Sequence, residues 1–168
     1  LDTITKVHLL VYRNLSNGEL IIADTDSKIK DALVDLQDKK IIGHNILGFD
    51  LIALKKLYDF SVPIDQTLDT LILSRLIYPN IRETDSKIRS IEAKLWGSHS
   101  LKAWGERLGS FKGTLSQQED AFKELTSEMI DYCVNDVHLT ELLYEYLSDS
   151  LPTKESIDLE HHIADICL

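Results

Sequence analysis

Cysteine is scarce in this sequence, and long apolar runs are absent. Its 168 residues include two cysteines, Cys133 and Cys167. They are too few for a disulfide-stapled secreted domain, and their spacing is not typical of zinc binding or thiol exchange. The apolar runs are too short to cross a bilayer. We therefore expect a protein of a reducing, cytoplasmic compartment with no membrane partner.

Basic side chains are also in short supply. The chain has 18 Lys and Arg against 28 Asp and Glu, a formal charge of −10. This balance excludes a domain that binds nucleic acid by phosphate neutralisation alone, because such domains are usually basic along one face. The hydrophobic fraction of 43% excludes a disordered acidic tail and is enough for the core of one globular domain.

The hydrophobic pattern predicts strands and helices in alternation. Apolar, β-branched segments at 6–13 and 18–24 flank Asn17-Gly18, a strong signal for an antiparallel hairpin. Ser27 is placed to cap the helix that follows, and a charged linker spans 112–124. The order favours a mixed α/β domain. The remaining predicted elements are a strand at 40–43 and helices at 49–60, 69–78, 100–108, 127–147 and 157–168.

Two groups of polar residues are candidates for chemistry. Tyr132 and Asp136 are four residues apart in a predicted helix, so both project from one face. His44, Asn45 and Asp50 follow the end of a predicted strand. Each has an ordinary alternative: a solvated helix face for the first pair, a buried histidine for His44, and helix capping for Asp50.

Four blocks carry a family resemblance when they are read in order. They are GHNILGFD (43–50), DTLILSRLIYPN (69–80), GSHSLKAWGERLG (97–109) and MIDYCVNDVHLTELL (129–143). Together they resemble the 3′ to 5′ proofreading exonuclease domain of family A DNA polymerases, most closely those of short-tailed lytic bacteriophages. The resemblance covers roughly residues 6–147.

The resemblance implies a fold, an activity and partners. The fold would be ribonuclease-H-like, with a mixed central sheet flanked by helices. Residues 1–150 would form the exonuclease domain, and 151–168 would begin a linker helix toward a polymerase domain. The substrate would be a single-stranded 3′ end of DNA, cleaved during replication in the host cytoplasm.

The resemblance also implies a site of the DEDDy class, made of four carboxylates and a tyrosine. Asp50 and Asp136 would be ligands of two Mg²⁺ or Mn²⁺ ions, which release a nucleoside monophosphate by hydrolysis. Tyr132 would orient the attacking water, and Asn45 would hold the substrate strand. The metals would neutralise the phosphate, so the domain itself can be acidic.

One motif of the family is missing. Its first motif is Asp-x-Glu on a central strand, whereas Asp2 matches the loop after that strand. The Asp158-Leu159-Glu160 triplet lies in a predicted helix, where its carboxylates diverge by about 200°. We therefore expect an N-terminally truncated domain with weak or no exonuclease activity. Its open sheet edges would favour a homodimer.

Three alternatives remain open at this stage. A stand-alone DEDD-type exonuclease acting on RNA or DNA shares the Asn, Asp and Tyr-x-x-x-Asp pattern, as do the proofreading domains of family B polymerases. A catalytically dead nucleic-acid-binding module is the non-enzyme alternative. Five basic residues could flank a DNA strand or belong to an ordinary mixed-charge surface: Lys87, Arg89, Lys94, Lys102 and Arg107.

Overall fold

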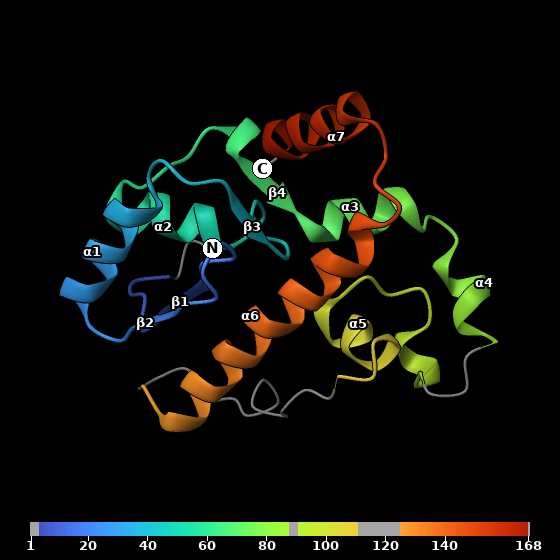
Figure 1. Cartoon of the computed structure of the whole chain (residues 1–168), viewed down its shortest axis with the longest axis horizontal. Helices are drawn as coiled ribbons and strands as arrows, with labels where there is room; N and C mark the ends of the chain where they lie inside the picture. Colours follow the sequence, from blue (N-terminus) through green and yellow to red (C-terminus); the bar gives the residue numbers. More distant parts are fainter. Residues whose placement is uncertain (1–3, 88–90, 111–124, 168) are drawn as a thin grey trace.

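The predicted hairpin opens the structure, a computed structural model that describes residues 4–87, 91–110 and 125–167 (Figure 1). Strand β1 (Leu10–Arg13) pairs antiparallel with β2 (Leu20–Ala23). The turn needs Gly18, which has a φ of 74° that residues with a Cβ rarely adopt. The hairpin prediction is confirmed.

Helix α1 (Asp26–Leu36) follows the hairpin, but its cap differs from the prediction. Thr25, not Ser27, is the N-cap, and the Thr25 hydroxyl accepts from the backbone N–H of Lys28. Thr25 has the extended backbone that a capping residue requires, whereas Ser27 already lies within the first helical turn.

A parallel strand pair lies at the centre of the molecule. β3 (Ile41–Gly43) pairs with β4 (Thr67–Asp69), and Gly43 stands opposite Asp69. The connection between them contains α2 (Asp50–Tyr58) and the short helix η1 (Ile64–Gln66). β4 was not predicted, because its three residues are too few to show alternation and a helix follows immediately.

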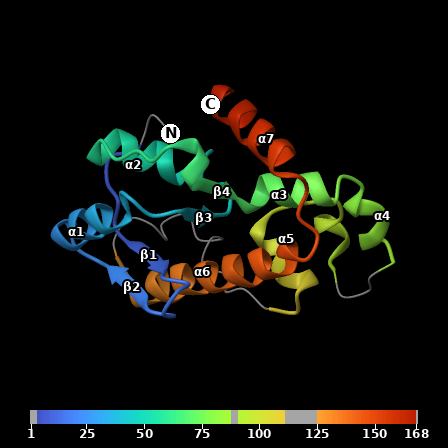
Figure 2. The same ribbon diagram turned by 45° about the horizontal axis from the view of Figure 1, so that its top comes forward.

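Helices make up most of the remaining chain. α6 (Ser127–Ser148) crosses the molecule diagonally in Figure 1, and α7 (Lys154–Ile166) contacts α3 (Thr70–Ile77; Figures 1 and 2). α7 begins three residues before its predicted start, because Thr153 caps it. The predicted linker at 112–124 lies outside the described residues. No helix in the described part of the chain is both long and apolar enough to span a membrane. These elements are α3 (Thr70–Ile77), α4 (Ile81–Asp85), η2 (Ala93–Leu95), α5 (Leu101–Arg107), α6 (Ser127–Ser148) and α7 (Lys154–Ile166).

The structure is mixed α/β, as predicted, and its strands are divided between small sheets. Within the described ranges they form two separate two-stranded sheets, β1–β2 and β3–β4. In both views β1 lies between β2 and the β3–β4 pair (Figures 1 and 2). Among these residues β1 and β3 each therefore have one edge with no strand partner. The homodimer through open edges stays a prediction.

The core is divided in the same way. One cluster joins the hairpin, α1 and α2 around Ile29, Leu33 and Phe60. The other joins α3, α5 and α6 around Leu73, Trp104 and Leu143. Helix α6 links the two clusters, because it contacts β1 as well as α3 and α5.

One candidate DNA contact belongs to the second cluster instead. The Arg107 side chain is only 6% exposed, and its Nε and Nη2 donate to the Asp85 carboxylate at 2.9 and 2.8 Å. The guanidinium carbon also lies 4.8 Å from the centre of the Trp104 ring. Arg107 is therefore a structural residue, and the proposal that it flanks DNA is wrong.

Replacing Leu143 by alanine tests this packing. Leu143 is fully buried in α6, so Leu143→Ala should lower the free energy of unfolding by about 2–5 kcal/mol through lost contacts and a residual cavity. Urea denaturation measures the change. Leu159→Ala is the control, because Leu159 is 59% exposed on α7. Equal losses in the two variants would contradict the assignment of the core.

Candidate functional site

The candidate site begins at the carboxyl ends of the two parallel strands. Because Gly43 is paired with Asp69, the loop 44–49 leaves β3 directly beside the start of α3. In open α/β sheets, ligands commonly bind where parallel strands end. Three of the predicted site positions, at His44, Asn45 and Asp50, lie on this loop or at the first residue of α2.

Asp69 holds this loop in place. Its side chain is 2% exposed, and its Oδ1 accepts from the backbone N–H of Asn45 at 2.8 Å. Its Oδ2 accepts from the N–H of Leu47 at 3.2 Å. Oδ1 also accepts from the N–H of Leu71 at 2.9 Å and so caps α3. One buried carboxylate thus joins the loop, β4 and α3.

Sequence analysis missed the role of Asp69. We placed it at the start of a helix, where an aspartate is ordinarily explained by capping alone. The available signal was the motif itself: Asp69-Thr70 opens one of the four blocks that resemble the family, and both residues are buried. An aspartate that only caps a helix can stay at the surface, so the burial of Asp69 indicates a further role.

Thr70 provides a second attachment. Its hydroxyl donates to the carbonyl of Gly43 at 3.2 Å, and it lies 2.9 Å from Nδ1 of His44. Since the single hydroxyl proton is given to Gly43, His44 donates from Nδ1 to the Thr70 oxygen. His44 is therefore a partly buried, hydrogen-bonded histidine, which matches the alternative to a chemical role that the sequence left open.

Asn45 has a strained backbone that this network supports. Its φ of 59° lies in the left-handed region, which Asn tolerates better than most residues. Its Oδ1 lies so close to Gly48 that an added Cβ there would be 2.7 Å away. Asn45 is exposed, so its amide is accessible to a ligand.

Asp50 is the first residue of α2 and is exposed to water. Although the residue as a whole is exposed, burial of its carboxyl group against the surrounding protein raises its pKa to about 6. A hydrogen bond from its own backbone N–H opposes this shift, and the negative charges of Asp69 and Asp136 add to it. Asp50 therefore stands in an acidic environment formed by two other elements.

α6 carries Tyr132 and Asp136, and it brings Asp136 close enough to Asp50 to affect its pKa. Tyr132 and Asp136 are both half-buried on this helix. Burial, followed by the charges of Asp136 and Asp50, raises the pKa of the Cys133 thiol to about 11. Asp136 and Asp50 thus act on each other and on the same neighbour, although they are 86 residues apart in the sequence.

The described carboxylates do not by themselves form a metal-binding group. Within the described ranges, no group of three or more His, Cys, Asp and Glu side chains could hold a metal ion. Asp158 and Glu160 do not complete one, because they lie on helix α7 as predicted and Asp158 pairs with Lys154. Asp50 and Asp136 have the oxygen chemistry that Mg²⁺ prefers, but more carboxylates are needed.

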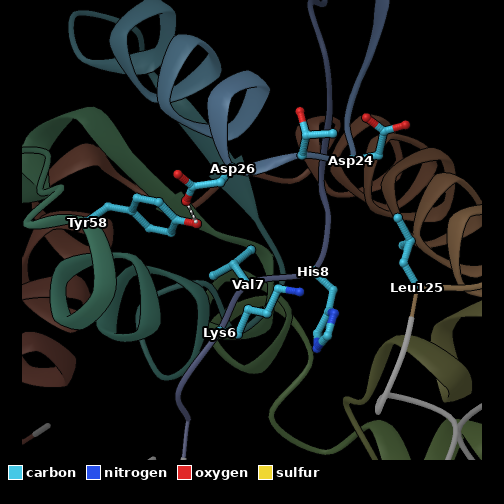
Figure 3. A pocket seen from close by; sticks show the side chains of 8 residues that line it. Lys6, Val7, His8, Asp24, Asp26, Tyr58 and Leu125 are labelled. Carbon is cyan, nitrogen blue, oxygen red and sulfur yellow. Dashed lines mark hydrogen bonds between the residues drawn. The ribbon is translucent and has the colours of Figure 1, made fainter.

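A separate cavity of about 320 Å³ lies away from these residues (Figure 3). Its lining includes Tyr58, whose hydroxyl donates to Asp26 at 3.1 Å. Tyr58 is at the opposite end of α2 from Asp50, about 12 Å along the helix. None of the predicted site residues lines this cavity.

The pKa of Asp50 predicts a pH-dependent stability. A raised pKa means that the folded state disfavours the charged carboxyl, so Asp50 destabilises the fold above pH 6. The penalty should fade between pH 6 and 4 and vanish below, where the carboxyl is neutral in both states. Asp50→Asn should therefore raise the melting temperature at pH 7.5 but not at pH 3.5.

Asp31→Asn, at an exposed position of α1, is the matched control for loss of one charge. Thermal unfolding followed by circular dichroism at both pH values measures the effect. A rise at pH 7.5 no larger than in the control would show that Asp50 carries no electrostatic penalty.

The chain is similar to two DNA-directed DNA polymerases of bacteriophages. It is 33% identical to the enzyme of Escherichia phage T7 over 177 residues, which cover 88% of this chain and 25% of the polymerase. It is 38% identical to that of Enterobacteria phage T3 over 133 residues, covering 64% of this chain and 18% of the polymerase. No protein-family model matches.

The chain therefore spans about a quarter or less of the length of these relatives. The resemblance to phage DNA polymerases, inferred from four sequence blocks, is confirmed. Both matches extend well beyond the few residues of the candidate site.

Proposed function

We propose that this chain is a truncated 3′ to 5′ exonuclease domain of a family A DNA polymerase, and that the complete domain removes nucleotides from a DNA 3′ end. One observation carries the proposal: Asp50 and Asp136, predicted as metal ligands, share one acidic environment. They do so in a chain whose similarity to phage DNA polymerases covers most of its length. If Asp136 lay on a helix face surrounded only by water, its charge would not be expected to raise the pKa of Asp50.

The proposed fold is ribonuclease-H-like and needs one more strand. β1 and β3 each have an edge with no strand partner among the described residues, and the two edges belong to neighbouring sheets. A strand between them would join the four strands into one mixed sheet. The family's Asp-x-Glu motif on this strand would add the carboxylates that the site lacks.

Each residue has a proposed role at the 3′ end. Two divalent cations, when bound, would neutralise the phosphate and activate water. Asp50 and Asp136 would provide oxygen ligands, and Tyr132, on the same helix face as Asp136, would orient the attacking water. Asn45 would bind the substrate strand from the loop that Asp69 fixes.

The acidic composition is consistent with cations, not basic side chains, neutralising the DNA phosphate. A formal charge of −10 repels DNA unless cations intervene. The raised pKa of Asp50 comes mainly from burial of its carboxyl group, and the negative charges of Asp69 and Asp136 add to it. A bound divalent ion would remove this repulsion and hold both side chains.

Shortening of DNA tests the function. We would compare the 168-residue chain with an extended version that has an added N-terminal strand bearing Asp-x-Glu, on 3′ single-stranded DNA with Mn²⁺. The extended version should release mononucleotides, and the 168-residue chain should cleave much more slowly. Asp136→Asn should reduce the cleavage rate at least about 100-fold. Mutating a residue that only hydrogen-bonds to a metal ligand already lowers metal affinity or activity by about 10- to 100-fold, and Asp136 would be a ligand itself.

Asp131→Asn is the matched control, because Asp131 is exposed on the same helix. Cleavage that survives Asp136→Asn, or no Mn²⁺-dependent cleavage by the folded extended version, would contradict the proposal. Faster cleavage of RNA than of DNA ends would favour the stand-alone exoribonuclease instead.

Gly48→Ala tests the role of Asn45. The new Cβ would lie 2.7 Å from Asn45 Oδ1, and the Asn45 side chain is free to rotate away, so the fold should survive. Binding of the 3′ end by the extended version should weaken by about tenfold, the value of one lost hydrogen bond. Fluorescence anisotropy with Ca²⁺ in place of Mn²⁺ measures the affinity. Unchanged affinity would exclude Asn45 from substrate binding.

A further inference from the structure

His161 is a buried residue on a helix that contributes nothing to the predicted site. It lies in α7 and is 3% exposed, whereas its neighbour His162 is exposed. Its Nε2 is 2.8 Å from the backbone nitrogen of Asp69, and its Nδ1 is 2.8 Å from the carbonyl oxygen of Ile157. Both ring nitrogens are therefore used.

These partners determine the form of the imidazole. A carbonyl oxygen only accepts, so Nδ1 carries the proton and donates to Ile157. Nε2 then has a free lone pair and accepts from the N–H of Asp69. The ring is neutral, and its tautomer is fixed by two backbone groups from different elements.

Asp69 connects this histidine to the candidate site. The backbone N–H of Asp69 is held by His161, while its carboxylate holds the N–H groups of Asn45 and Leu47. Without His161, the buried N–H of Asp69 would lose its acceptor, which is energetically costly. Asp69 would then be held less firmly, and its carboxylate would position the loop 44–49 less well. Three hydrogen bonds, all made by Asp69, therefore link α7 to the loop 44–49.

We propose that His161 is a positioning residue for the loop 44–49, acting through Asp69. The role in catalysis rests on the proposed exonuclease function, whereas the coupling itself does not. α7 thus sets the geometry in which Asn45 meets the substrate. A displacement of α7 would move Asp69 through His161 and, through the Asp69 carboxylate, the loop 44–49.

Three substitutions test the coupling. His161→Leu removes the acceptor, His161→Gln retains an acceptor oxygen at a similar distance, and His162→Leu changes an exposed histidine whose Nδ1 contacts only its own helix. Amide hydrogen exchange by NMR at Asn45 and Leu47 should accelerate at least tenfold in His161→Leu. Exchange at Leu33, buried in α1, should change much less. His161→Gln and His162→Leu should resemble the unmodified chain.

Unchanged exchange at Asn45 and Leu47 in His161→Leu, or equal acceleration at Leu33, would overturn the proposal. The unmodified chain provides an independent check if His161→Leu does not fold. Its imidazole ¹⁵N spectrum should show Nδ1 protonated, with a correlation across the hydrogen bond between Nε2 and the N–H of Asp69. The opposite tautomer would also overturn the proposal.

The catalytic part has its own readout. In the extended version described above, His161→Leu should raise KM for the 3′ end several-fold with a smaller change in kcat, and His161→Gln should restore KM. The exchange experiment uses neither metal nor DNA, so its result stands if the exonuclease proposal fails. Faster exchange with an unchanged KM would overturn the positioning role and leave the exonuclease proposal intact.

Discussion

The buried carboxylate of Asp69 is the interaction on which the candidate site depends. It accepts from three backbone N–H groups, which belong to the loop 44–49 and the start of α3. A buried charge is costly unless it is fully hydrogen-bonded, so these groups must stay together for the fold to be stable. The same requirement supports Asn45 in its left-handed conformation, because the Asn45 N–H is one of these three groups.

Acidic side chains from different elements act on one another at the site that this loop carries. Asp50 and Asp136 come from α2 and α6, and their charges raise the pKa of nearby groups. Stability alone would favour a cation or neutral side chains here, whereas cation-dependent hydrolysis would favour this excess of acid. The protein gives up some stability at the place where the proposed function needs negative charge.

Much of this could be predicted from the sequence. Asn17-Gly18 identified the hairpin, and helical spacing placed Tyr132 and Asp136 on one face of α6. The role of Asp69 could not be predicted, because it depends on β4, a strand of three residues, and on loop amides more than 20 residues away. His161 was missed for the same reason: it lies 92 residues from its partner Asp69. The division into two sheets also depends on pairing, which local patterns do not encode.

We propose that Asp50 and Asp136 belong to one cation site, and Mn²⁺ titration followed by NMR can test this without activity. Mn²⁺ broadens the resonances of nearby nuclei even when it binds weakly, so the test does not require activity. At substoichiometric Mn²⁺, amides around Asp50 and Asp136 should broaden together, and Asp136→Asn should abolish the effect at both. Broadening centred on Asp158 and Glu160, or on only one of the two aspartates, would contradict the account.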